Sequence, residues 1–259
     1  MSDTRMAERV CVVTGAGSGI GAATAQLLAE KGALVVCADL DGDAAQVTAH
    51  KISTGHGTAT ALTTDVSRES DIEDLVAQTL SRFGRIDVLH NNAGIGVVGS
   101  VHETSVQDWD RCMSVNLRGT FLMSRAVIPV MLRQGRGAIV NTCSNHATVA
   151  SPERAAYAAS KGGIKTLTRQ MARDYSPAIR VNCVSPGLVD TPIARHARLG
   201  AGPEAVEAWR TRVESNRYFN RAAEAREIAF GVLFLASDEA SFLTGHDLVM
   251  SGGQGEVAF

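Results

Sequence analysis

Three side chains near the middle of the chain have the types and spacing needed for proton transfer. Tyr157 and Lys161 lie four residues apart, and Ser144 comes thirteen residues before Tyr157. Residues four apart on a helix share a face, so the phenol and the ammonium would project side by side. A free phenol has a pKa of about 10, and an ammonium within about 4–6 Å favours the phenolate. Such a phenol can exchange a proton with an alcohol or carbonyl oxygen. A Tyr-x-x-x-Lys pair alone also fits an ordinary surface helix.

The composition is that of an ordinary globular protein and excludes several classes of function. The 259 residues are 45% hydrophobic and 20% charged, with a net charge of −2. This balance leaves no basic surplus for nucleic acid or for an anionic membrane. No apolar run reaches the ~18 residues of a membrane span, and the first residues do not resemble a secretory signal. The five cysteines lack any CxxC spacing, which favours reduced, mostly buried thiols over disulfides or zinc. We therefore expect a cytoplasmic protein without a metal site.

A glycine-rich loop between a strand and a helix predicts a phosphate-binding turn. The β-branched run 9–14 leads into this loop, and a helix over 22–31 and a strand over 33–38 follow. Glycines allow a tight turn and let backbone N–H groups approach a pyrophosphate at a helix N-terminus. Asp39, after the second strand, would bind the ribose hydroxyls and repel a 2′-phosphate, which favours NAD over NADP. The alternative is that Asp39 only caps the next helix.

The spacing Thr14-Gly15-x-x-x-Gly19-Ile20-Gly21 resembles that of the short-chain dehydrogenase/reductase family, in its compact single-domain type. Other family segments follow in the expected order. These are Asn91-Asn92-Ala93-Gly94, Ser144, Tyr157-x-x-x-Lys161 and Pro186-Gly187-x-Val189-x-Thr191. The resemblance covers essentially residues 8 to 253. It implies an NAD-dependent oxidoreductase that transfers a hydride between a secondary alcohol or ketone and nicotinamide, with the tyrosine as acid and base.

The resemblance implies four catalytic residues. Ser144 would donate a hydrogen bond to the substrate oxygen, Tyr157 would move the proton, and Lys161 would tune Tyr157 and hold the nicotinamide ribose. Asn116 would sit at a local helix irregularity and hold a water that links the lysine to solvent. His146 departs from the family pattern, and we leave open a substrate contact and a surface role. A Ser–His nucleophile is disfavoured because no GxSxG elbow surrounds Ser144.

The implied cofactor site is spread over the carboxyl ends of the predicted strands. Asp65 and Val66 would lie at the adenine, although Asp65 could also cap the following helix. Val189 and Thr191 would orient the nicotinamide carboxamide. The full implied cofactor set is Gly15, Ser18, Gly19, Ile20, Gly21, Asp39, Asp65, Val66, Asn92, Ala93, Gly94, Tyr157, Lys161, Pro186, Gly187, Val189 and Thr191. The implied substrate contacts are Ser144, His146 and Tyr157.

Seven apolar strands alternate with helical segments, which predicts an α/β fold with a parallel sheet. The expected architecture is a Rossmann-like, doubly wound, seven-stranded sheet with helices on both faces, in a single domain over 1–259. A helical lid is expected at about 190–220. Acidic residues are interspersed among the basic residues over 192–220, so an anionic substrate and a solvated helix face both stay open.

Two other classes of function remain open. One is a lyase or epimerase that uses the same fold and a transient oxidation, and the other is a dinucleotide-binding regulator without activity. For the enzyme, the expected partners are a small alcohol or ketone substrate and further copies of the chain, as a homotetramer or homodimer, because family members are commonly tetramers.

Overall fold

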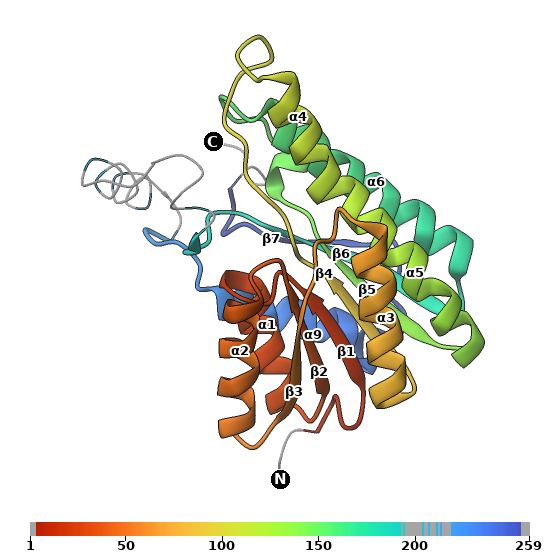
Figure 1. The fold of residues 1–259 in the computed structure, drawn as a ribbon. Coiled ribbons are helices and arrows are strands. Elements are labelled where there is room, and N and C mark those ends of the chain that lie inside the picture. Colours follow the sequence, from red (N-terminus) through yellow and green to blue (C-terminus); the bar gives the residue numbers. More distant parts are fainter. Residues whose placement is uncertain are drawn as a thin grey trace.

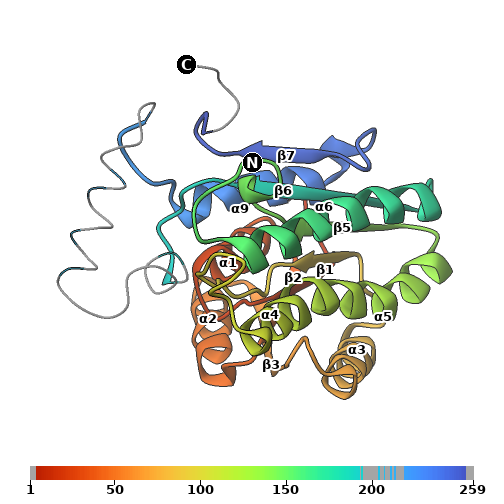
Figure 2. The same cartoon turned by 90° about the horizontal axis from the view of Figure 1, so that it is seen from above.

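A fully parallel, seven-stranded sheet runs through the molecule in the order β3-β2-β1-β4-β5-β6-β7 (Figures 1 and 2). The computed structural model describes residues 4–192, 194, 204, 207, 211, 213 and 219–254. The strands are β1 Val10–Thr14, β2 Leu34–Asp39, β3 Thr58–Thr63, β4 Val88–Asn91, β5 Gly137–Thr142, β6 Ile179–Pro186 and β7 Asp247–Met250. The predicted parallel sheet of seven strands is therefore confirmed.

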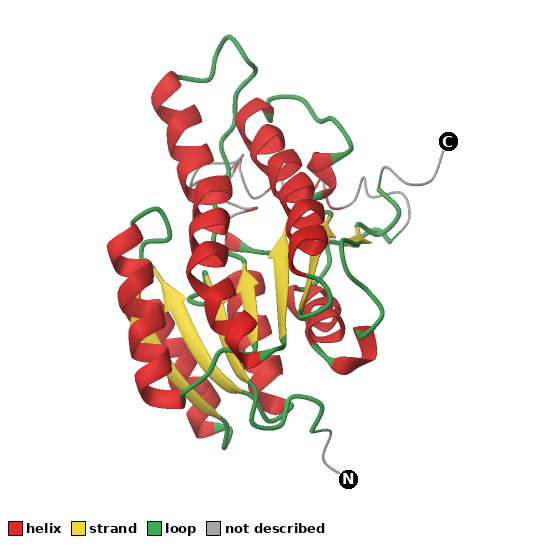
Figure 3. Ribbon diagram, turned by 90° about the vertical axis from the view of Figure 1, so that its right-hand side faces the viewer, coloured by secondary structure: helices red, strands yellow, loops and turns green. Residues whose placement is uncertain are grey.

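Helices cover both faces of this sheet, as the alternation of strands and helices predicted (Figures 1 and 3). One face carries α1 Gly19–Glu30, α2 Gly42–Thr54 and α9 Ala225–Ala236. The other carries α3 Glu69–Phe83, α5 Gly119–Gln134 and α6 Ala155–Tyr175, and α4 Val106–Cys112 packs against α6 on the same side. Side chains alternate along β1, so Cys11 and Val13 pack in the first core and Val12 packs in the second. This period of two explains why the strand is apolar throughout.

The order of the strands reverses between β1 and β4. The chain runs outward from β1 through β2 to β3, and it then returns to build β4 to β7 on the other side of β1. Adjacent loops diverge at such a switch point, and a crevice forms beyond the carboxyl ends of the two strands. The fold therefore places the ends of β1 and β4 where a nucleotide would bind.

Element boundaries depart from the predicted ones by a few residues where the backbone turns sharply. The sequence predicts a helix from Pro152 through Tyr175, but α6 begins at Ala155, because Glu153 adopts a φ of 59° that a right-handed helix does not contain. The sequence likewise predicts a strand from Thr244 to Met250, but β7 begins at Asp247, because Gly245 turns with a φ of 72°. Most of the predicted lid lies outside the described residues.

The cysteines and the helices fit two expectations from the sequence, buried reduced thiols and no apolar run long enough for a membrane span. All five cysteines are buried as free thiols. Across 4–192 and 219–254 and the few residues described between them, no helix has the length and apolar character needed to span a bilayer.

A buried histidine makes the stability of the fold dependent on pH. His90 on β4 is fully buried, and burial lowers its pKa from 6.5 to about 3. The unfolded chain binds a proton here below about pH 6.5, whereas the folded chain does not until about pH 3. Lowering the pH through this window therefore favours the unfolded state.

We expect His90→Asn to flatten this dependence. The variant lacks the titrating group, so its unfolding free energy should fall less steeply between pH 6.5 and 4, by up to about 1.4 kcal/mol per pH unit. Urea unfolding at several pH values measures both slopes. His50→Asn, an exposed histidine on α2, serves as control. Equal slopes for the wild type and His90→Asn would contradict the argument.

Candidate active site

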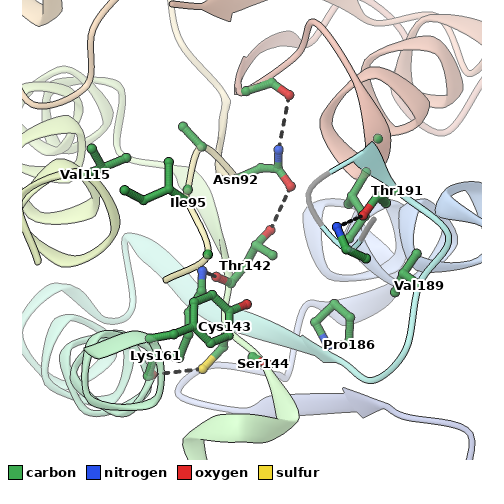
Figure 4. Close-up of a pocket in the computed structure, with 18 of the residues that line it drawn as sticks. Asn92, Ile95, Val115, Thr142, Cys143, Ser144, Lys161, Pro186, Val189 and Thr191 are labelled. Carbon is green, nitrogen blue, oxygen red and sulfur yellow. Dashed lines mark hydrogen bonds between the residues drawn. The ribbon is translucent and has the colours of Figure 1, made fainter. Parts of the chain in front are cut away.

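A pocket of about 650 Å³ opens at the carboxyl ends of the strands, where the strand order reverses (Figure 4). Every site residue predicted from the sequence lines it except Gly21 and Asn116. Those two lie in the supporting layer, as described below. Sites of this size bury small ligands and cofactors.

The glycine-rich loop needs its glycines for close backbone approach. Gly15 and Gly19 have φ values of 66° and 52°, which L side chains rarely adopt. A Cβ on Gly21 would lie 2.0 Å from the Gly15 carbonyl oxygen. Gly19 begins α1, so the loop passes directly into the N-terminus of that helix. The loop therefore fits the diphosphate of a dinucleotide, because backbone N–H groups and the helix dipole favour a negative charge there.

Asp39 at the end of β2 does not cap the next helix. Its two carboxylate oxygens accept hydrogen bonds from the backbone N–H groups of Gly17 (2.8 Å) and Asp41 (3.0 Å). Asp41 is the N-cap of α2 and accepts from Ala44 N–H. The capping alternative is therefore wrong. The Asp39 carboxylate lies in the pocket wall and is tied to the glycine-rich loop.

Asp65 lies in the pocket wall ahead of α3. One of its carboxylate oxygens accepts from both the N–H and the hydroxyl of Ser67, at 2.9 and 2.7 Å. The N-cap of α3 is Arg68, whose N–H donates to the Asp65 carbonyl. Asp65 thus orders the turn before the helix, and this role is compatible with a contact to the adenine.

A hydrogen-bonded chain crosses the floor of the pocket and joins β1, β4, β5 and α6 (Figure 4). Asn92 Nδ2 donates to the carbonyls of Thr14 and Gly15, and its Oδ1 accepts from Thr142 Oγ1. Lys161 Nζ donates to the Thr142 carbonyl at 2.8 Å. His90 Nε2 shares a hydrogen bond of 2.9 Å with the same Thr142 hydroxyl. This network fixes the lysine relative to the glycine-rich loop.

The Tyr157–Lys161 pair has the shared orientation that its spacing predicts. Both lie on α6, and the Lys161 Nζ is 5.7 Å from the centroid of the Tyr157 ring. Lys161 is buried, with 4% of its surface exposed. A buried ammonium acts through a lower effective dielectric than an exposed one. The lysine is therefore well placed to stabilise negative charge on the phenol oxygen.

Ser144 and His146 follow the carboxyl end of β5 and line the same pocket as Tyr157. Ser144 is the N-cap of a short 3₁₀ helix, Asn145–Ala147, and its hydroxyl accepts from His146 N–H at 3.2 Å and donates to Asn145 Oδ1 at 3.3 Å. The His146 ring contacts Tyr157 edge-on, with centroids 6.0 Å apart and an interplanar angle of 83°. His146 thus lies in the pocket wall beside the phenol.

Asn116 supports the site from behind. It lies in a π-helix, Met113–Arg118, between α4 and α5, and it is fully buried. Its Oδ1 accepts from Ile95 N–H (2.8 Å) and its Nδ2 donates to the Ile95 carbonyl (3.0 Å) and Ser160 Oγ. The helix irregularity expected at this position is present. Asn116 fixes the loop after β4, and its role in a water relay stays a prediction.

The sequence interpretation missed several residues of the pocket wall. They include Arg111, Val115, Thr142 and Gln254, whereas Ile95 and Arg154 lie in the segments 94–98 and 145–154 that the sequence assigns to the pocket without naming single residues. Spacing gives a signal for one pair, since Arg111 lies one helical turn before Val115. Gln254 has no such signal, because it follows the last strand.

Comparisons with known proteins agree with this fold and site. A family model described as enoyl-(acyl carrier protein) reductase matches residues 15–254. The chain is 38% identical to a D-threitol dehydrogenase of Mycolicibacterium smegmatis, over 97% of this chain and 94% of that protein. It is 41% identical to a trans-4-hydroxycyclohexanecarboxylate dehydrogenase of Sinomonas cyclohexanicum, over 96% and 94%. The crystal structure of a levodione reductase superposes with a TM-score of 0.93 at 35% identity, covering 97% of this chain and 99% of that one.

The fold and site define an oxidoreductase that acts on alcohol or ketone groups with a nicotinamide cofactor. The chain belongs to the short-chain dehydrogenase/reductase family.

Proposed function

We propose that the protein is an NAD-dependent dehydrogenase of secondary alcohols, or equivalently a reductase of ketones. The observation that carries the proposal is the Tyr157–Lys161 pair, which lies in the same pocket as Ser144 and the glycine-rich loop. The Lys161 Nζ is 5.7 Å from the centroid of the Tyr157 ring. Related proteins are named for polyol and cyclic alcohol substrates, which supports a secondary alcohol here.

Three side chains divide the work of this reaction. Tyr157 takes the hydroxyl proton during oxidation and returns it during reduction. Ser144 donates a hydrogen bond to the substrate oxygen and stabilises the charge that develops on it. Lys161 stabilises the phenolate of Tyr157 and binds ribose hydroxyls. The nicotinamide ring supplies the site that accepts or donates the hydride.

We propose NAD as the cofactor because of the charge at the end of β2. Asp39 presents a carboxylate to the pocket, and a carboxylate binds ribose hydroxyls but repels a 2′-phosphate. The neighbouring Leu40 is 70% exposed and carries no charge that could balance such a phosphate.

An absorbance assay tests the function. The purified protein is mixed with NAD and a panel of secondary alcohols, and formation of the reduced ring is followed. Net reduction supports the dehydrogenase. A lyase or epimerase would convert its substrate without net reduction, and a regulator would bind NAD without any turnover, so either result would overturn the proposal.

We expect Asp39→Asn to weaken the preference for NAD over NADP. The amide keeps an oxygen that can accept from the Gly17 N–H but loses the negative charge, so repulsion of a 2′-phosphate disappears. The ratio of kcat/KM for NAD to that for NADP should fall about tenfold or more. Asp43→Asn, an exposed acid on α2, should leave the ratio unchanged. An unaltered ratio in Asp39→Asn would show that this carboxylate does not select the cofactor.

A further inference from the structure

Charge is distributed unevenly along the described wall of the pocket. Its acidic side chains in the described part of the chain are Asp39 and Asp65, which follow β2 and β3. Its cationic side chains there are Arg111, Arg154 and Lys161, which come from α4 and from α6 and its N-cap, on the other side of the switch point. The end of the pocket that holds Tyr157 is therefore positive, and the end assigned to the adenosine is negative.

Arg111 lies at this positive end, and its side chain is not used to hold together the part of the chain that the structure describes. It lies on the last turn of α4, and Val115, one turn further along, also lines the pocket. The side chain is exposed, and it forms no ion pair or hydrogen bond with any residue that the structure describes. By contrast, Arg118, at the end of the π-helical segment that follows α4, donates hydrogen bonds to the Ser67 carbonyl and to Glu69. The Arg111 guanidinium is thus available to a ligand.

Arg154 is fixed beside the catalytic tyrosine by the backbone. It is the N-cap of α6, three residues before Tyr157. The loop after β4 holds this point, because Gly99 N–H donates to the Glu153 carbonyl at 2.9 Å and Ala155 N–H donates to the Gly99 carbonyl at 3.3 Å. The Arg154 Nε is buried in the pocket wall. The segments that flank Tyr157 thus bring a second guanidinium to the substrate end.

We propose that the substrate carries a carboxylate, which Arg111 and Arg154 bind while its hydroxyl or keto group meets Ser144 and Tyr157. A guanidinium presents paired N–H donors that match the two oxygens of a carboxylate, and such charge-assisted hydrogen bonds are among the strongest in proteins. This inference rests on the proposed function, and it narrows the substrate class to hydroxy acids and keto acids.

Binding of unreactive carboxylates tests the inference independently of turnover. The protein saturated with NADH is titrated calorimetrically with butanoate, pentanoate and cyclohexanecarboxylate, and with the primary amide of each. We expect each carboxylate to bind at least about tenfold more tightly than its amide, a difference of about 1.4 kcal/mol. In Arg111→Met and Arg154→Met this ratio should fall about tenfold, and Arg111→Lys should recover part of it.

Controls separate a lost contact from a damaged fold. Arg169→Met, an exposed arginine further along α6 and outside the described pocket wall, should keep the wild-type ratio. Thermal unfolding is measured for every variant, and Arg111→Met decides the matter if Arg154→Met does not fold, because Arg111 is exposed. The inference is overturned if carboxylates and amides bind equally, if no carboxylate binds, or if the ratio survives in Arg111→Met.

Failure of the inference differs from failure of the proposed function. Turnover of 4-hydroxypentanoate and of its amide is measured with NAD in parallel. Turnover of neutral alcohols without preferential carboxylate binding would refute the anion site and leave the dehydrogenase intact. Carboxylate binding that needs both arginines, without oxidation of any alcohol, would support the anion site and refute the dehydrogenase.

Discussion

Replacing Tyr157 with Phe should lower kcat by about a hundredfold to ten-thousandfold, the usual contribution of a positioned acid or base. The substitution removes only the hydroxyl. The ring keeps its place over Lys161 and its edge contact with His146, because both involve the aromatic face or edge. Binding of NAD should therefore survive, and the loss should appear in the chemical step. Steady-state kinetics with the best alcohol of the panel, together with calorimetric titration of NAD, measures both.

Tyr175→Phe supplies the matched control. Tyr175 closes the same helix, α6, but packs against the hydrophobic core away from the pocket. It should retain wild-type turnover. If Tyr157→Phe also retained turnover, proton transfer would not pass through this phenol and the proposed mechanism would be refuted.

Gly21→Ala should destroy cofactor binding although alanine is the better helix former. The new Cβ would lie 2.0 Å from the Gly15 carbonyl oxygen and 2.6 Å from Asn92 Nδ2. Both atoms belong to the network that joins the glycine-rich loop to β4. Forcing atoms into a packed site costs about 1–3 kcal/mol or more, which outweighs the gain in helix propensity of about 1 kcal/mol. We expect a lower melting temperature and an affinity for NAD weaker by about a hundredfold.

Gly162→Ala provides the opposite case on α6. A Cβ at that position meets nothing within 4 Å, so the substitution should stabilise the fold by about 0.5–1 kcal/mol through the helix backbone alone. Thermal unfolding of the two variants compares a crowded and an open helical glycine. If Gly21→Ala were as stable as Gly162→Ala, a Cβ would fit at position 21 and the steric argument would be wrong.

Local patterns were sufficient for the elements and for two parts of the pocket, the glycine-rich turn with its acid and the tyrosine–lysine pair. The β-branched run before Gly15, the glycine spacing and the acid after the next strand all lie within one strand–helix–strand unit, where spacing along the chain determines position in space. The same holds for Tyr157 and Lys161, because one helical turn brings them together whatever surrounds them. Asn92, Ser144 and Val189 were assigned to a common site by the resemblance to short-chain dehydrogenases, and this agrees with the rule that the carboxyl ends of parallel strands meet at one edge of the sheet.

Other features depended on contacts between distant segments. The sequence left two roles open for Asp39, and hydrogen bonds from Gly17 and Asp41 excluded the helix cap. The sequence predicted an irregular helix at Asn116. Its hydrogen bonds to Ile95 could not be predicted, because they form only where the loop after β4 passes that helix.

The sequence by itself thus determined the order of the elements, the parallel sheet, the glycine-rich turn and the tyrosine–lysine pair. Each of these depends on the spacing of residues within a single element or a single strand–helix–strand unit. Only the tertiary structure brought Arg111 and Arg154 to the same end of one pocket and placed Asp39 and Asp65 at the other. The reason is physical: the two arginines are forty-three residues apart, and their proximity to the site depends on how α4 and α6 pack together, which no local pattern encodes.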